Sequence, residues 1–229
     1  MSVKLRPYPE YKESGVHRVG PIPGHWQTCA LKRVCRLCYG DALPSDGRMP
    51  GPVPVYGSNG RVGWHTTPNT DGCCLIIGRK GSFGKVTYSA RPSFAIDTTY
   101  FVDHRHTSNY LRWLYYALLW AGLDDCSRDS AVPGLDKDDA NSRMIPLPSL
   151  QEQRHISAFL DLHLVHTDHL IRAKRRQIEL LNEQKQAIMS RAVTRGLDSN
   201  VRLKPSGLDW LGDIPYHWEP TRLKYVADV

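Results

Sequence analysis

The feature that most constrains the fold is one very long helical segment with a clear start and a clear end. Residues 149–152 read Ser-Leu-Gln-Glu, a capping box that places a hydroxyl at the start of a helix and a carboxylate three residues later. Apolar residues then recur with helical spacing as far as Arg195, and Gly196 supplies a left-handed stop. At 1.5 Å per residue, a helix of about 45 residues is about 70 Å long.

A helix of this length cannot bury its apolar stripe against a single small domain, so it needs another long helix as a partner. Its heptad a and d positions include six apolar residues, which are Leu160, Leu164, Ile171, Ile178, Leu181 and Ile188. The sequence predicts only one such helix in the unit that precedes Gly196. We therefore expect it to pair as an antiparallel coiled coil with the same helix of a second unit.

An internal repeat shows how these units are arranged along the chain. Residues 12–34 align without a gap to residues 204–226, at an offset of 192, and 11 of the 23 positions are identical. The identities include His25 with His217 and Trp26 with Trp218. A period this long excludes a solenoid, whose repeats span about 20 to 50 residues. The sequence therefore contains one unit of about 190 residues and then the opening of a second.

The part of the unit before the long helix is predicted to be mostly β structure. Between residues 51 and 102, short β-branched or aromatic runs alternate with glycine-rich turns. A helix is expected over residues 108–121, a loop over 124–139, and an edge strand near 144–148, where prolines cannot donate to a ladder. The expected fold class is α+β: a glycine-rich, mostly β domain with a packed helix, followed by the long helix.

Charge is distributed unevenly in this domain. The net charge of the chain is +7, and residues 48–91 hold six basic residues against one acid, Asp71, a local charge of +5. Residues 92–150 carry five basic and eight acidic residues, a local charge of −3. A basic block within a glycine-rich β segment is compatible either with polyanion binding or with a solvated basic face.

Other features bound the class of protein. The six cysteines lack the spacing of a zinc site beyond Cys35-x-x-Cys38, so we expect reduced thiols and assign no metal. The apolar runs are too short for a membrane helix, and the first residues lack the apolar core of a signal peptide. We therefore expect a soluble, cytoplasmic protein.

Several motifs in one order resemble a known family. They are Gly-x-Ile-Pro-x-His-Trp at 20–26, Tyr-Gly-Ser-Asn-Gly at 56–60, Ile-Gly-Arg-Lys-Gly-Ser-Phe-Gly at 77–84, Ala-Val-Pro-Gly-Leu at 131–135, Ile-Pro-Leu-Pro-x-x-x-Glu-Gln at 145–153, and Val-Thr-Arg-Gly-Leu at 193–197. Together they resemble the specificity subunit of Type I restriction–modification systems. That family has two target-recognition domains, each followed by a long helix, whereas this chain resembles a half-subunit with one.

The resemblance implies a domain organisation and a function. Residues 1–148 would form a target-recognition domain, 149–196 the spacer and dimerisation helix, and 197–229 the truncated start of a second recognition domain. A homodimer, or a pair with another half-subunit, would recognise a bipartite DNA site, which two-fold symmetry makes palindromic in the homodimer. Methyltransferase subunits that carry S-adenosylmethionine would methylate adenine there, and a motor-endonuclease subunit would add cleavage. The chain itself would need no cofactor.

The candidate DNA-binding residues come mainly from the two glycine-rich turns. Glycines let a backbone approach phosphate closely, and basic side chains neutralise it. The candidates are Tyr56, Gly57, Ser58, Asn59, Gly60, Arg79, Lys80, Gly81, Ser82 and Lys85, with His106 and Arg128 as possible base readers. The turns are expected to position the DNA backbone, and base readout is expected from the loops at 64–70, 104–108 and 124–130.

The alternatives to a DNA-recognition role differ in how far the sequence supports them. Catalytic signatures are missing: the 78–85 loop lacks the order of a nucleotide-binding P-loop, and no methyltransferase or nuclease motif is found. The chain could be a truncated remnant that binds methyltransferase subunits without recognising DNA, with residues 204–229 either docked beside the far helix end or functionless. A stand-alone regulator would need a compact groove-reading element, which the sequence does not indicate.

Overall fold

The computed structural model describes residues 7–16, 19–125 and 134–226. Two compact units are found, Met1–Asp161 and Leu162–Val229, and the boundary between them falls within the long helix. The three-part division of the chain at residues 148 and 196 stays a prediction.

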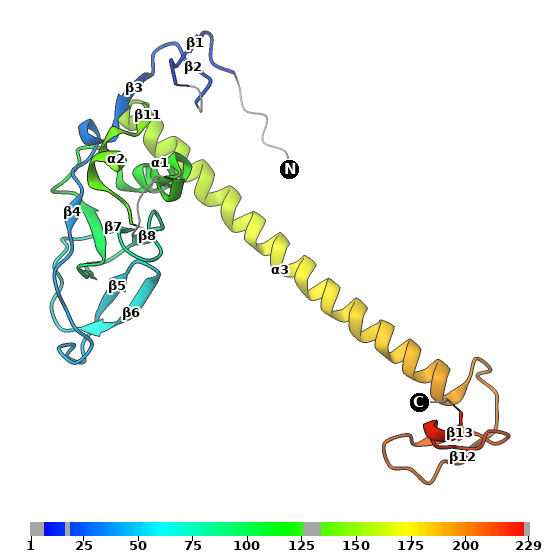
Figure 1. The fold of residues 1–229 in the computed structure, drawn as a ribbon. Coiled ribbons are helices and arrows are strands. Elements are labelled where there is room, and N and C mark those ends of the chain that lie inside the picture. The colour runs from blue at the N-terminus through cyan, green and yellow to red at the C-terminus, as the bar shows by residue number, and fades with distance from the viewer. Residues whose placement is uncertain (1–6, 17–18, 126–133, 227–229) are drawn as a thin grey trace. The chain divides into compact units, whose positions relative to one another are not determined.

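The first unit is built mainly of short strands (Figure 1). In chain order they are β1 (Tyr11–Glu13), β2 (Pro21–Pro23), β3 (Gln27–Ala30), β4 (Cys38–Tyr39), β5 (Val53–Gly57), β6 (Gly60–His65), β7 (Cys74–Gly78), β8 (Val86–Ser89), β9 (Phe94–Ala95), β10 (Thr99–Asp103) and β11 (Met144–Leu147). The helices are α1 (Leu111–Ala121), α2 (Lys137–Ser142) and the start of α3 (Leu150–Arg195), with 3-10 turns at Leu31–Arg33 and Leu123–Asp125. The mixture of strands and helices confirms the α+β class.

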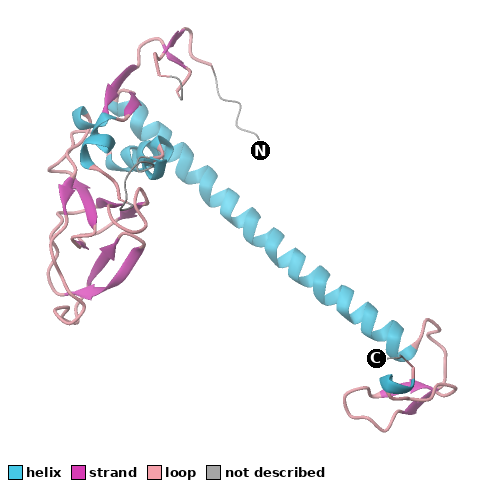
Figure 2. Ribbon diagram, in the orientation of Figure 1, coloured by secondary structure: helices cyan, strands magenta, loops and turns pink. Residues whose placement is uncertain are grey.

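The strands form two main sheets. A four-stranded antiparallel sheet has the order β4-β10-β7-β8, and a three-stranded sheet has the order β6-β5-β9, in which β5 and β9 are parallel. The core lies where α1 packs against β7 and β8, and its fully buried side chains include Leu75, Ile77, Val102, Leu114 and Leu118. Figure 2 shows α1 and α2 close to the start of α3, whereas the β5–β6 hairpin lies at the other end of this unit.

The start of α3 is fixed to the first unit by polar side chains. The capping box is confirmed, because the Ser149 amide donates to Glu152 Oε2 at 3.1 Å and the Glu152 amide donates to Ser149 Oγ at 3.4 Å. The side chain of Gln153 is 1% exposed, and its Oε1 accepts from the amide of Tyr110, the residue that precedes α1. One buried amide therefore orients the first turn of α3 against the start of α1.

The long helix matches its predicted bounds closely. It has 46 residues and is followed by Gly196 in the left-handed region, with φ of +74°. Five of the six predicted pairing residues are exposed by 43% to 60% of their surface, namely Leu164, Ile171, Ile178, Leu181 and Ile188, whereas Leu160 is half-buried. The exposed stripe has no partner within the described residues of the chain, and coiled-coil pairing stays a prediction.

Two further expectations can be compared with the structure. The edge strand predicted near 144–148 is β11, which pairs with β3 in a two-stranded sheet. The loop predicted over 124–139 is only partly a loop, because Asp136 accepts hydrogen bonds from the amides of Asp138 and Asp139 and so caps α2. No helix among the described residues is long and apolar enough to span a membrane.

The second unit contains most of α3 and a small hairpin. The hairpin consists of β12 (Leu203–Pro205) and β13 (Asp213–Pro215), and a 3-10 turn follows at Leu223–Tyr225. Each of these elements lies 192 residues after its counterpart in the first unit, namely β1, β2 and the turn at Leu31–Arg33. The sequence repeat is therefore also a repeat of structure.

Candidate nucleic-acid interface

The two glycine-rich turns proposed from the sequence lie side by side in the first unit. Lys85 Nζ donates to the backbone oxygen of Asn59 at 2.8 Å and to its Oδ1 at 3.0 Å. Ser58 Oγ donates to the carbonyl of Thr98 at 3.0 Å. The structure thus brings residues 56–60 and 78–85 together. The side chain of Lys85, a candidate for phosphate binding, is hydrogen-bonded to the other turn.

Arg79 is also used inside the domain. Its guanidinium lies 5.2 Å from the ring centroid of Tyr39, and its Nη2 donates to the carbonyl of Asp97 at 2.8 Å. Lys80, Gly81 and Ser82 are exposed and form the outer part of the loop. Among the candidates from the 78–85 loop, these three therefore have the surfaces most available to a ligand.

His106 lies in a buried cluster around Asp103. Its side chain is 7% exposed, and its Nδ1 is 2.8 Å from Oδ1 of Asp103. Burial lowers the pKa of His106, although the nearby Asp103 carboxylate opposes this. The other proposed base reader, Arg128, lies outside the described residues.

Asp103 is the acceptor that orders this cluster. Burial alone would raise its pKa, but hydrogen bonds from the Arg105 side chain and from the amides of Asp71 and Arg105 outweigh burial and lower the pKa to about 2. The carboxylate is therefore ionised at neutral pH and fixes the turn that follows β10. In this geometry His106 supports the loop from inside.

A second basic group, which the sequence did not single out as a cluster, surrounds Trp64 on β6. The guanidinium carbon of Arg61 lies 4.9 Å from the centroid of the Trp64 ring, and that of Arg91 lies 5.2 Å from it. Both arginines are exposed, and Trp64 is 40% exposed. Within the part of the chain that the structure describes, no carboxylate forms an ion pair with either arginine. We call Arg61, Trp64 and Arg91 the arginine–tryptophan cluster.

A β-bulge explains why Arg61 and Trp64 share a face. In a regular strand, residues three apart point to opposite faces. Here Val55 pairs with Gly63 and the next residue, Tyr56, pairs with Arg61, so Val62 is an extra residue in β6. The bulge reverses the alternation and turns Arg61 to the side of Trp64, while His65 is buried.

Arg48 lies against the same strand. Its Nη1 donates to the carbonyl of Val62 at 2.8 Å, so it binds the bulge itself. Three arginines from three separate segments of the basic block therefore converge on β6. In the sequence, the excess of basic residues over 48–91 was the only indication of such a cluster, and it did not show which arginines would lie together.

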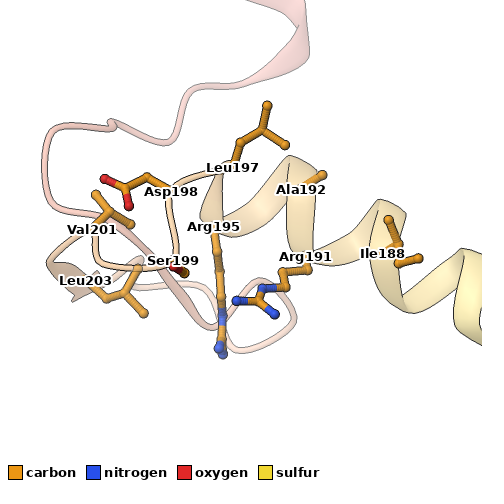
Figure 3. A pocket seen from close by; sticks show the side chains of 10 residues that line it. Ile188, Arg191, Ala192, Arg195, Leu197, Asp198, Ser199, Val201 and Leu203 are labelled. Carbon is orange, nitrogen blue, oxygen red and sulfur yellow. The ribbon is translucent and has the colours of Figure 1, made fainter.

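A pocket of about 320 Å³ lies in the second unit, at the end of α3. Figure 3 shows the side chains of Arg191 and Arg195 extending to the same side of the helix end, with Asp198 on the loop that follows.

The described residues contain no group of three or more His, Cys, Asp or Glu side chains placed to hold a metal ion. The cysteine thiol at position 35 is buried, which raises its pKa to about 12.

Comparisons with known proteins identify the family. Residues 23–180 match the family described as the Type I restriction modification DNA specificity domain. The Type I restriction enzyme MjaVIII specificity subunit of Methanocaldococcus jannaschii is 33% identical over 119 residues, which are 51% of this chain and 26% of that protein. The EcoDI specificity subunit of Escherichia coli is 24% identical over 227 residues, which are 92% of this chain and 50% of that protein.

A solved structure shares the fold. It is described as the structural basis of complex assembly and conformational transition of the type I restriction–modification system. Its TM-score is 0.64 and its sequence identity is 22%, and the match covers 80% of this chain and 49% of that chain. The chain spans a quarter to half the length of these relatives. A specificity subunit is a non-catalytic component of its enzyme, in agreement with the missing catalytic motifs. With more than half of its residues matched, the chain belongs to the family of Type I restriction–modification DNA specificity domains.

Proposed function

We propose that the first unit binds double-stranded DNA and that the arginine–tryptophan cluster contacts the DNA backbone. The observation that carries this proposal is the position of Arg61 and Arg91 on Trp64, both exposed and without an acidic partner among the described residues. Stacking on an aromatic ring restricts a guanidinium while leaving its N–H groups free for phosphate or guanine. Less ordering is then needed when DNA binds.

The exposed part of the 78–85 loop would add phosphate contacts. Lys80 supplies a charge, and the amides and hydroxyl of Gly81 and Ser82 supply neutral donors. Arg79 and Lys85 would act indirectly, because their side chains hold the two turns together. We assign positioning of the DNA backbone to Lys80, Gly81 and Ser82, and base readout to the less regular loops.

The exposed stripe on α3 supports pairing with a second chain. A row of exposed leucine and isoleucine side chains on a 46-residue helix is a surface that another long helix would cover. An antiparallel homodimer would have two-fold symmetry and would present two identical recognition domains to DNA. The target would then be bipartite and palindromic.

The chemistry would belong to partner subunits. Methyltransferase subunits with bound S-adenosylmethionine would methylate adenine in each half-site, and a motor-endonuclease subunit would add cleavage where it is present. This chain would supply specificity without catalysing a step. Pairing with a different half-subunit would give an asymmetric target instead.

A binding experiment tests the role of the cluster. Arg61→Gln combined with Arg91→Gln should weaken binding to duplex DNA at least tenfold at moderate salt, because two phosphate contacts are lost. Arg172→Gln, which removes a charge from α3, serves as the control and should have a much smaller effect. Equal DNA affinity of the double variant and the wild type would exclude the cluster as a DNA contact.

Modification-sensitive sequencing of the native genome, with the gene intact and deleted, tests the whole function. Loss of a gapped, palindromic N6-methyladenine motif on deletion is the expected result. Loss of an asymmetric motif would instead indicate a different half-subunit as partner. Unchanged methylation would favour a remnant that binds methyltransferase without directing it.

A further inference from the structure

The C-terminal hairpin repeats the N-terminal hairpin hydrogen bond by hydrogen bond. We call residues 11–26 the N-terminal copy and residues 203–218 the C-terminal copy. The strand pairs Tyr11 with Pro23 and Leu203 with Pro215 have the same register. Three further backbone hydrogen bonds recur at the offset of 192. Ser14 N donates to Gly20 O, as Ser206 N does to Gly212 O, and Gly24 N donates to Glu10 O, as Tyr216 N does to Arg202 O. In the same way, Trp26 N donates to Pro23 O and Trp218 N donates to Pro215 O.

The N-terminal copy has an identifiable task, which is to bind the first turn of α3. The indole Nε1 of Trp26 donates to Glu152 Oε1 at 3.0 Å, and Nε2 of His25 lies 2.8 Å from the same oxygen. The other carboxylate oxygen of Glu152 accepts from the amide and hydroxyl of Ser149. We call residues 149–152 the acceptor turn, since its carboxylate receives both side chains of the hairpin.

The C-terminal copy carries the same pair of side chains without an acceptor. His217 and Trp218 stand at the positions of His25 and Trp26. Among the described residues, neither side chain has a polar partner, and the ring of Trp218 lies close to Gly196 at the end of α3. The described residues therefore contain two copies of the hairpin and one acceptor turn.

We propose that the C-terminal copy is a second docking hairpin for the acceptor turn. In a paired molecule it binds the acceptor turn of a second copy of this chain, where it replaces the N-terminal copy of that second chain. This inference rests on the antiparallel pairing proposed above. Antiparallel helices place the end of one α3 beside the start of the other, which is where the acceptor turn lies. The occupant follows from the contact that the same motif already makes in this chain.

The exchange keeps the donor pair that contacts Glu152. Both copies offer one indole N–H and one imidazole to Glu152, so the two side-chain contacts with the carboxylate are the same before and after exchange. The buried Ile22 and Pro23 have counterparts in the buried Ile214 and Pro215. The C-terminal copy therefore carries the same indole, imidazole, isoleucine and proline side chains at the equivalent positions.

Two differences favour the N-terminal copy in an isolated chain. Tyr8 packs against the rings of His25 and Trp26, and the residue at the equivalent position of the C-terminal copy is Asn200. The N-terminal copy also continues into β3, which pairs with β11. Pairing of two chains offsets this advantage, because it raises the effective concentration of the C-terminal copy at the acceptor turn. The exchange is therefore a property of the dimer.

The test is a cycle of full-length variants whose dimer dissociation constants are measured by analytical ultracentrifugation. His25→Ala with Trp26→Phe removes the donors of the N-terminal copy, and His217→Ala with Trp218→Phe removes those of the C-terminal copy. In the background that lacks the N-terminal donors, loss of the C-terminal donors should raise the dissociation constant at least about tenfold, since neither hairpin then offers an indole or imidazole to Glu152. In the wild-type background the increase should be smaller.

Trp210→Phe is the matched control. Trp210 is an 81% exposed indole in the same C-terminal copy, and its substitution should leave the dissociation constant unchanged. Circular dichroism of each variant establishes that the helix content is retained. If the substitutions at His217 and Trp218 leave the dissociation constant of the dimer unchanged in both backgrounds, the exchange is overturned but the pairing is not. A wild-type chain that stays monomeric at all concentrations would overturn the pairing and the exchange together.

Discussion

Arg112 of α1 and Asp161 of α3 are 49 residues apart in the chain, and Nε of Arg112 donates to Oδ1 of Asp161 at 2.8 Å. The same guanidinium lies 4.7 Å from the ring centroid of Tyr88 and about as close to those of Tyr115 and Tyr116. Arg112 therefore joins the last α3 turn of the first unit to the β8–α1 surface.

The two partners should differ in their effect on stability. Asp161→Asn should lower the free energy of unfolding of the first unit by about 1 kcal/mol, because the pair is partly solvated. Arg112→Leu should cost about 2 kcal/mol, because the aromatic contacts are lost as well. Urea denaturation followed by tryptophan fluorescence measures both. Equal losses would mean that the tyrosine contacts contribute nothing.

Glu152 should make the first unit sensitive to acid. Burial alone would raise the pKa of Glu152, but hydrogen bonds from Trp26, Ser149 and His25 hold that pKa at about 2, below the ordinary 4.5. A carboxylate whose pKa is lower in the folded state stabilises the fold above its unfolded pKa. This stabilisation is lost as the pH falls from about 4.5 to about 2.

The check is the free energy of unfolding at pH 5 and at pH 3. Glu152→Gln should lose less stability between these values than the wild type does. A residual decrease should remain in the variant, because the pKa of Asp103 is also about 2. Identical decreases in the two proteins would show that Glu152 is not held in its charged form.

Two glycines of the 78–85 loop should respond differently to alanine. Both Gly81 and Gly84 have a positive φ, of +73° and +74°. A Cβ on Gly84 would lie 2.2 Å from the amide nitrogen of Asp124, whereas a Cβ on Gly81 would meet nothing within 4 Å. Gly81→Ala should therefore cost about 1 kcal/mol from backbone strain, and Gly84→Ala at least about 3 kcal/mol. Thermal denaturation of the two variants compares them directly, and equal melting temperatures would contradict the close approach.

Arg61 and Arg79 should separate DNA affinity from stability. Arg61→Gln should reduce the slope of log affinity against log salt by about 1 without changing the melting temperature, since a phosphate contact is lost. Arg79→Gln should lower the melting temperature, since it removes contacts with Tyr39 and Asp97. A salt slope that responds to Arg79→Gln and not to Arg61→Gln would transfer the DNA contact to the glycine-rich loop.

The elements that the sequence predicted well are those with local signals. The capping box at Ser149 and the glycine at 196 depend on neighbouring residues only, and α3 begins and ends within one residue of its predicted limits. The repeat at an offset of 192 likewise needed no knowledge of the fold. Helix α1 begins three residues after its expected start, where Gln153 binds the amide of Tyr110 from a distant part of the chain.

The candidate site was predictable only in part, because its geometry depends on contacts between distant segments. The two glycine-rich turns were identified, but the bond between Lys85 and Asn59 is visible only in the folded chain. The arginine–tryptophan cluster depends on the bulge at Val62, and strict alternation would have placed Arg61 and Trp64 on opposite faces. Arg91 reaches the cluster from the connection between β8 and β9, which has no local pattern.

The face of α3 that pairs can be tested with two substitutions on one turn of the helix. Ile178 occupies a heptad a position and is 58% exposed, and Leu180 is 48% exposed but lies about 200° further round the helix. Ile178→Glu should raise the dimer dissociation constant at least tenfold, because a charge would be buried in the seam. Leu180→Glu adds the same charge outside the seam and should change the constant little. Sedimentation equilibrium of both variants provides the measurement. A larger effect of Leu180→Glu would mean that the opposite face of α3 forms the pair, and the predicted register would have to be rebuilt around Leu162 and Leu180.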